Sequence, residues 1–131
     1  MKLQLKSSKV SQLYFSKPEN SETFFNLDYV IQKINTTNFS VEFKLEIIDP
    51  DVFEMGLVYN SIFEADSSLP EAEDFENNKF FSQNAPAIAY PYLRAFVSTV
   101  MLNAGYSPLM LPSVNFVEFN KKKKDSQNSK L

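Results

Sequence analysis

The sequence predicts an α+β fold in which a four-stranded antiparallel sheet carries a long helix on one face. Two observations predict it: apolar and polar residues alternate with a period of two through much of the first half, and a nearly uncharged helical stretch follows. A chain of 131 residues can bury one sizeable core. We therefore predict a single domain over residues 1–120, followed by a basic, disordered tail over residues 121–131 that has no apolar period.

Four segments carry strand signals. In residues 38–48, NFSVEFKLEII, apolar side chains occupy every second position, as on a strand with one buried face. Segments 24–34 and 52–63 show the same alternation, and residues 10–15 form a shorter candidate. Asn, Asp and Pro fill the two gaps between the last three segments and favour turns there. Such short connections predict that strands adjacent in the sequence pair with each other.

The helix is predicted to begin near Ile88 and to end at Gly105. Pro91 then lies in the first turn, where backbone N–H groups have no partner within the helix. Gly105 suits the left-handed position that follows many helices. Residues 65–84 are predicted to be a polar connection, and residues 106–120 an extended tail because two prolines interrupt them.

At about 100° per residue, the helix has two apolar stripes. The broader stripe suits the sheet, but the second needs another cover, and the chain has little left to provide one. We predict that another copy of the protein covers it, which makes the chain a homo-oligomer. The predicted oligomer interface consists of Ile88, Tyr92, Ala95 and Leu102.

Composition excludes several classes of function. The chain has no His and no Cys, so it has no histidine base, thiol nucleophile or Cys/His zinc site. Its paired acids are explained by turns and by the wet face of a strand, so we predict no enzyme activity, no metal and no cofactor. A net charge of −3 disfavours nucleic acid as a partner. No leader and no membrane-inserting stretch is recognisable, which predicts a cytoplasmic protein.

Residues 90–116, YPYLRAFVSTVMLNAGYSPLMLPSVNF, resemble the C-terminal core of the SecB protein-export chaperones. The matching residues are Pro91, Tyr92, Arg94, Gly105, Pro108, Leu109, Leu111, Pro112, Val114, Asn115 and Phe116. The resemblance implies a four-stranded sheet with helices on one face, assembled into a homotetramer as a dimer of dimers. It also implies that the protein is not an enzyme and uses no nucleotide or metal.

The function that the resemblance implies is ATP-independent holding of unfolded precursor polypeptides in apolar grooves, with delivery to the export ATPase SecA. Apolar and main-chain contacts in such grooves give broad specificity. By similarity, the client-binding groove is expected at Phe25, Leu27 and Tyr29 on the sheet and at Tyr106, Leu109, Met110 and Leu111 on the tail.

Two departures from the family pattern keep alternatives open. After Phe116 the family continues into a second amphipathic helix, whereas this sequence runs into four lysines. Family members that bind SecA carry outer-surface acids where this chain has Ser16 or Lys17, and Gly56. SecA delivery is therefore left open, and a dedicated chaperone for one partner, such as an antitoxin, is an alternative. Two simpler hypotheses also remain: the protein is a structural oligomer without clients, or the apolar residues of the tail only cap the core.

Overall fold

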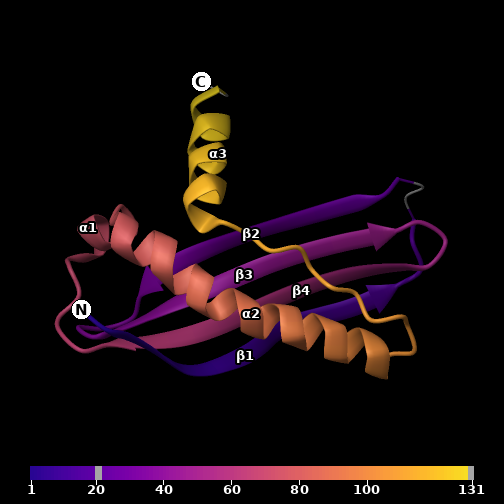
Figure 1. Cartoon of the computed structure of the whole chain (residues 1–131), viewed down its shortest axis with the longest axis horizontal. Coiled ribbons are helices and arrows are strands. Elements are labelled where there is room, and N and C mark those ends of the chain that lie inside the picture. The colour runs from indigo at the N-terminus through magenta and orange to yellow at the C-terminus, as the bar shows by residue number, and fades with distance from the viewer. Residues whose placement is uncertain (20–21, 130–131) are drawn as a thin grey trace. The chain divides into compact units, whose positions relative to one another are not determined.

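The computed structural model describes residues 1–19 and 22–129, with side chains up to residue 124. The chain forms two compact units, Met1–Glu76 and Asn77–Leu131. Four strands and a short helix make up the first unit, and two helices joined by an extended segment make up the second (Figure 1). The predicted α+β class with a four-stranded antiparallel sheet is confirmed. Within the described ranges, no helix has the length and apolarity needed to cross a membrane.

The sheet has the order β1-β4-β3-β2, and each neighbouring pair is antiparallel. Its strands are β1 (Leu3–Ser16), β2 (Phe24–Lys33), β3 (Asn38–Asp49) and β4 (Phe53–Ala65). The predicted pairing of sequence neighbours is correct for β2, β3 and β4 but wrong for β1, which pairs with β4. The connection of residues 17–23 reaches about 23 Å when extended. Three strand spacings need only about 14 Å, so the chain can cross the sheet end.

Strand β1 is longer than the predicted segment 10–15 because two register shifts interrupt its alternation. The shifts lie between Leu5 and Ser7 and between Val10 and Gln12. A β-bulge inserts one residue into one strand, so the period of two is lost in the sequence while the pairing continues. The apolar side chains of β1 are only half-buried, as expected for an edge strand.

The turns of the sheet follow from their Asn and Asp residues. Between β2 and β3, the Asn35 side-chain oxygen accepts hydrogen bonds from the backbone N–H groups of Thr37, at 3.0 Å, and Asn38, at 2.8 Å. Between β3 and β4, Asp51 has a φ of 69°, in the left-handed region that Asp tolerates better than most residues. Both turns lie where the sequence predicts them.

One face of the sheet is buried on its two central strands, β3 and β4. On β3 the predicted alternation is confirmed, since every second residue from Phe39 to Ile47 is buried. Phe39 stacks on Phe63 of β4 with ring centroids 5.2 Å apart and an interplanar angle of 7°. Helix α1 (Ala72–Glu76) adds the fully buried Phe75, whose ring lies 5.2 Å from that of Phe39. This aromatic cluster closes one end of the buried face.

In the second unit, helix α2 (Lys79–Asn103) begins nine residues before the predicted start at Ile88. Asn78 caps it, because its side-chain oxygen accepts from the Phe80 N–H at 2.9 Å. Pro86 lies inside the helix and cannot bond the Ser82 carbonyl four residues earlier. The Asn120 amide donates to that carbonyl at 2.9 Å instead. The helix therefore tolerates a proline that the sequence pattern treats as a boundary.

The end of α2 agrees with the prediction at Gly105. This residue has a φ of 96°, and its N–H donates to the Leu102 carbonyl at 3.2 Å. The Tyr106 N–H donates to the Met101 carbonyl at 2.9 Å. These two bonds form a Schellman motif, which satisfies carbonyls that the last helical turn leaves open.

Helix α3 (Phe116–Ser129) occupies residues for which the sequence predicts an extended segment up to residue 120 and a disordered basic tail from residue 121. The Asn115 side chain starts it by accepting from the Val117 N–H at 3.0 Å and the Glu118 N–H at 3.3 Å. Phe116 and Phe119 then supply its apolar side, with ring centroids 5.6 Å apart. The predicted tail ends at residues 130 and 131, which lie outside the described residues. The single-domain assignment of residues 1–120 stays a prediction.

Candidate functional site

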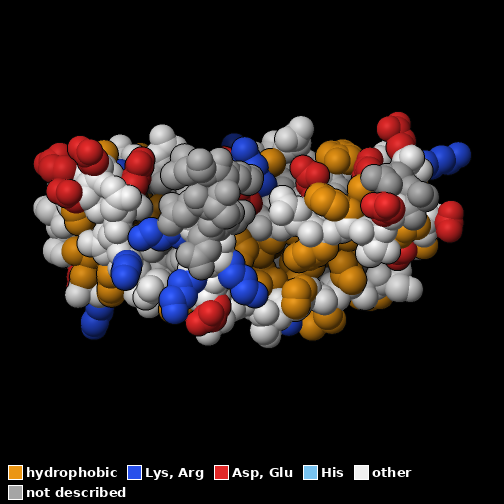
Figure 2. Space-filling view, turned by 90° about the horizontal axis from the view of Figure 1, so that it is seen from above, with side chains coloured by type: hydrophobic (Ala, Val, Ile, Leu, Met, Phe, Trp, Pro, Cys, Tyr) orange, Lys and Arg blue, Asp and Glu red, His pale blue; other side chains and the backbone are white. Residues whose placement is uncertain are grey.

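Apolar side chains reach the surface in both units. Figure 2 shows one face of the molecule, where hydrophobic side chains lie exposed beside acidic and basic groups. The exposed large apolar residues include Phe24, Phe25 and Val30 on β2, Tyr92 and Leu102 on α2, and Met110 after it. An apolar surface of this kind is typical of a protein that contacts other polypeptides.

The three predicted groove residues on the sheet all lie on β2 but differ in access. Phe25, Leu27 and Tyr29 follow each other at alternate positions and therefore share one face. Phe25 is 44% exposed, whereas Leu27 and Tyr29 are buried in the core. In the isolated chain, only Phe25 of the three offers substantial surface to a client.

The four predicted groove residues on the tail belong to the strap, which we define as residues 106–115, between α2 and α3. Met110 is 72% exposed, and its neighbour Leu111 is 1% exposed. Tyr106 and Leu109 are half-buried. The strap therefore combines one anchoring side chain with one side chain that is almost fully open to solvent.

Three side chains of α2 bind the strap through its backbone carbonyls. The Tyr90 hydroxyl donates to Pro112 O at 2.6 Å. The Arg94 Nε donates to Leu111 O at 3.0 Å. The Ser98 hydroxyl donates to Leu109 O at 2.8 Å.

These donors, which we call the ladder, are spaced four residues apart and so lie on one side of the helix. Tyr90 is further fixed by Phe116, whose ring meets it edge-on at 5.7 Å between centroids. Burial raises the pKa of Tyr90 above its ordinary value, and the nearby Arg94 charge opposes this rise. The hydroxyl therefore stays protonated and able to donate at neutral pH.

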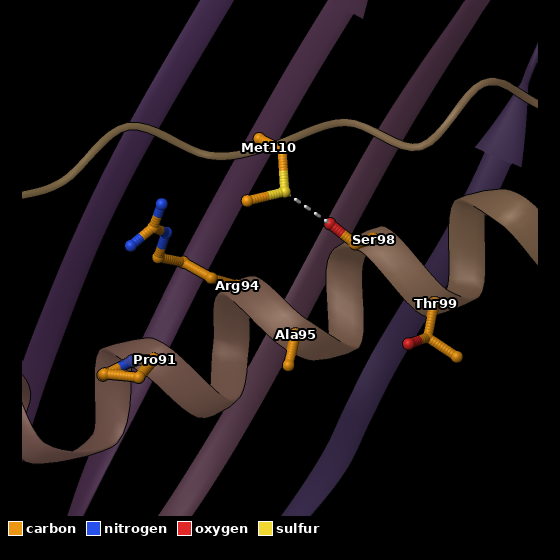
Figure 3. Close-up of a pocket in the computed structure, with 6 residues that line it drawn as sticks. All are labelled: Pro91, Arg94, Ala95, Ser98, Thr99 and Met110. Atoms are coloured by element: carbon orange, nitrogen blue, oxygen red, sulfur yellow. Dashed lines mark hydrogen bonds between the residues drawn. The ribbon is translucent and has the colours of Figure 1, made fainter.

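A shallow cavity of about 410 Å³ lies beside the ladder. It is lined by Pro91, Arg94, Ala95, Ser98 and Thr99 of α2 and by Met110 of the strap (Figure 3). The Ser98 hydroxyl also lies 3.6 Å from the Met110 sulfur. Three of the six lining residues are polar, but the lining surface open to the cavity is mostly apolar, so the cavity suits an apolar side chain better than a charged one.

The predicted oligomer interface forms one exposed stripe on α2. Tyr92 is 55% and Leu102 is 59% exposed, and Ile88 and Ala95 are exposed as well. All four lie within about 80° of one another around a helix with 100° per residue. On the other side of α2, the residues at every fourth position from Ala85 to Met101 are buried. The predicted division of the helix into two stripes therefore agrees with the burial pattern.

The outer face of the sheet carries a second, smaller cavity of about 180 Å³. Its lining includes Tyr14 and Gly56, which are cross-strand partners on β1 and β4. A Cβ atom at Gly56 would overlap the Tyr14 ring, so the tyrosine occupies space that a larger residue would fill. Burial, followed by the Glu54 and Glu46 charges, raises the pKa of Tyr14.

Sequence reasoning missed the ladder, although part of its signal was visible. Arg94 and Ser98 are polar residues four positions apart, and Arg94 is the one charged residue between positions 84 and 116. Tyr90 lies on the broader apolar stripe of the helix, and its hydroxyl partner, the Pro112 carbonyl, leaves no trace in the sequence. An extended segment with two prolines needs donors for its carbonyls, and this requirement points to such residues.

Comparison with known proteins gives a consistent assignment. The family model described as preprotein translocase subunit SecB matches residues 3–127. A protein-export protein SecB from Orientia tsutsugamushi (strain Boryong) is 27% identical over 132 residues, covering 89% of this chain and 80% of the relative. Its counterpart from Rickettsia bellii (strain OSU 85-389) is 27% identical over 109 residues, covering 79% and 69%.

Two solved structures share the fold. A Mycobacterium tuberculosis SecB-like chaperone, in complex with a ChAD peptide from the HigA1 antitoxin, has a TM-score of 0.62 and 14% identity. The match covers 86% of this chain and 87% of that one. A Streptococcus agalactiae protein of unknown function has a TM-score of 0.57 and 14% identity, over 86% and 98% of the two chains. Since the family model spans nearly the whole sequence, the chain belongs to the SecB family.

Proposed function

We propose that this chain is an ATP-independent holdase chaperone of the cytoplasm, which binds unfolded precursor polypeptides for export. One observation carries the proposal: a SecB family chain exposes Met110, at 72%, on an extended strap beside an apolar cavity. Methionine is flexible and polarizable, so it adapts to many apolar side chains. Such a surface favours clients with exposed apolar segments of varied sequence.

Client binding of this kind needs only contact surface. Phe25 on β2 and Met110 on the strap are the exposed members of the proposed groove, and Tyr106 and Leu109 contribute partly. Leu27 and Tyr29, in the first unit, and Leu111, in the second, are buried. The proposed function includes no catalysis, no nucleotide and no metal.

We also propose that the exposed α2 stripe of Ile88, Tyr92, Ala95 and Leu102 joins copies of the chain into a tetramer, as a dimer of dimers. Large apolar side chains at 55% and 59% exposure, as at Tyr92 and Leu102, are unfavourable in water. Covering the stripe with the same stripe of another copy gives a self-complementary contact of the kind found in two-fold symmetric dimers.

The test is suppression of aggregation of chemically unfolded proteins by the purified chain, followed by light scattering, with the molar mass measured in the same sample. We expect a tetramer to suppress aggregation of several unrelated clients without ATP. Native forms of the same clients serve as the control and should not bind. Assembly without any suppression would refute the holdase function.

A second candidate is a dedicated chaperone for one partner, such as an antitoxin. Two points favour it: by the resemblance, Ser16 or Lys17, and Gly56, stand where SecA-binding members carry acids, and the fold neighbour was solved with an antitoxin peptide. The two functions differ in breadth. A dedicated chaperone should suppress aggregation of one client only, and calorimetric titration with SecA should show no binding.

A further inference from the structure

The strap is an extended segment whose two edges differ. In an extended chain, the N–H and C=O of one residue point to the same side, and those of the next residue point to the other. Leu109 and Leu111 are therefore expected to face one way and Met110 the other. The ladder uses the carbonyls of Leu109 and Leu111, which places the edge containing these residues against α2. Tyr90 also binds the Pro112 carbonyl, so the alternation applies to residues 109–111 and ends at Pro112.

The ladder fixes the strap in one register. Its three donors belong to side chains of different length, a tyrosine, an arginine and a serine, so each donor fits the carbonyl at one position of the strap. A shift of the strap by one residue would turn the carbonyls of Leu109 and Leu111 away from Ser98 and Arg94. It would also move the buried Leu111 into solvent and the exposed Met110 into the core.

The other edge of the strap is open at Met110. Neither the N–H nor the carbonyl of this residue makes a hydrogen bond to any residue in the described part of the chain. Its side chain is 72% exposed and lines the 410 Å³ cavity. A free main-chain donor and acceptor beside an apolar cavity match the chemistry of an extended polypeptide, which offers a carbonyl, an N–H and an apolar side chain.

We propose that Tyr90, Arg94 and Ser98 are positioning residues for client binding: they hold the strap so that the Met110 edge pairs with the main chain of an extended apolar segment. This inference rests on the proposed holdase function and names the chemistry of its contact. Tyr90, Arg94 and Ser98 act through the strap and need not touch the client. The client's apolar side chain would lie in the cavity between Met110 and α2.

The test compares a variant without two ladder donors with conservative controls. Tyr90→Phe removes the hydroxyl but keeps the ring that packs on Phe116, and Ser98→Ala removes the second donor. Since each lost hydrogen bond has a modest net value, we expect the double variant to bind a fluorescent extended apolar peptide about tenfold more weakly. The control combines Tyr90→Phe with Ser98→Thr, which keeps the hydroxyl. This control should bind the peptide as tightly as the Tyr90→Phe single variant does.

A second arm reports on the strap without any client. The chain has no cysteine, so Ser113→Cys gives a unique site on the strap for a nitroxide label. Ser113 is exposed and follows Pro112, whose carbonyl Tyr90 binds. The label should be restrained with the ladder intact and mobile in the double variant. Equal mobility in both would overturn the positioning role.

The two arms separate this inference from the function on which it rests. If the unmodified chain binds no peptide, the holdase function fails, whereas the label still decides whether the ladder positions the strap. If the unmodified chain binds and the double variant binds equally well, the positioning role in client binding is refuted. N-methylation of successive amides in the peptide should weaken binding at one position, and unchanged binding throughout would exclude main-chain pairing.

Discussion

Met110 and Leu111 are neighbours on the strap, and their replacement by alanine should affect different properties. Leu111→Ala should lower the stability of the fold, whereas Met110→Ala should weaken client binding. Leu111 is 1% exposed and Met110 is 72% exposed. Leu111→Ala removes a buried side chain and leaves a cavity, so we expect it to lower the free energy of unfolding by about 3 kcal/mol. Met110→Ala removes a side chain that is already in water, so it should change the free energy of unfolding by less than about 0.5 kcal/mol.

Urea denaturation, followed by circular dichroism at one fixed protomer concentration, measures this difference. With a slope of about 2 kcal/mol per molar urea, Leu111→Ala should lower the midpoint by about 1.5 M. Met110→Ala should lower it by less than about 0.3 M. A fixed concentration is needed because oligomer formation contributes to apparent stability.

When suppression of client aggregation is measured, Met110→Ala should be the more damaging of the two variants. Met110→Ala removes the exposed contact and should weaken suppression of aggregation, whereas Leu111→Ala, assayed without denaturant, keeps Met110 in place. Equal midpoints for the two variants would show that Leu111 is not an anchor of the strap. A Met110→Ala variant that holds clients as well as the unmodified chain would remove Met110 from the binding surface.

Three further predictions concern the second unit. Leu102→Asp places a charge on the exposed stripe of α2 and should dissociate the oligomer, which sedimentation velocity would detect; an unchanged profile would remove Leu102 from the interface. Burial raises the pKa of Tyr90, so its stabilising contribution is complete below the ordinary tyrosine pKa and is lost as the pH rises through the raised value. The stability of Tyr90→Phe, measured by thermal unfolding, should therefore fall less over this alkaline range, and parallel profiles would argue against the assignment. Asn115→Ala removes the cap of α3 and should lower the free energy of unfolding by about 1 kcal/mol, whereas Asn115→Ser should retain most of it.

The sequence predicted those parts of the fold that local patterns determine. Alternation on β3 reports burial directly, and Gly105 is read correctly because the left-handed turn after α2 favours glycine. The partner of β1 could not be predicted, because bulges hide its alternation and it pairs with β4, from which β2 and β3 separate it in the sequence. The start of α2 was missed because Pro86 is compensated by Asn120, which lies 38 residues from the carbonyl that it satisfies.

For the candidate site, the sequence pointed to two segments but could not tell which of their side chains are exposed and which are buried. Alternation placed Phe25 and Leu27 on one face of β2, yet it cannot tell that the first is exposed and the second buried. On the strap, Met110 and Leu111 are equally apolar, and only the register set by α2 separates an open side chain from an anchor. Long-range hydrogen bonds decide this register, and they leave no period in the sequence.

An exposed apolar strap carries the risk of self-association, and its chemistry limits that risk. Strands that aggregate offer long runs of unpaired N–H and C=O groups to another chain. Here Pro108 and Pro112 bracket residues 109–111 of the strap and have no N–H to donate. The ladder occupies the carbonyls of Leu109 and Leu111, so between the two prolines only Met110 offers both main-chain groups outward. A polypeptide can pair there over a short stretch, but a growing sheet cannot extend along the strap, and this combination suits a surface that must bind unfolded chains without becoming part of an aggregate.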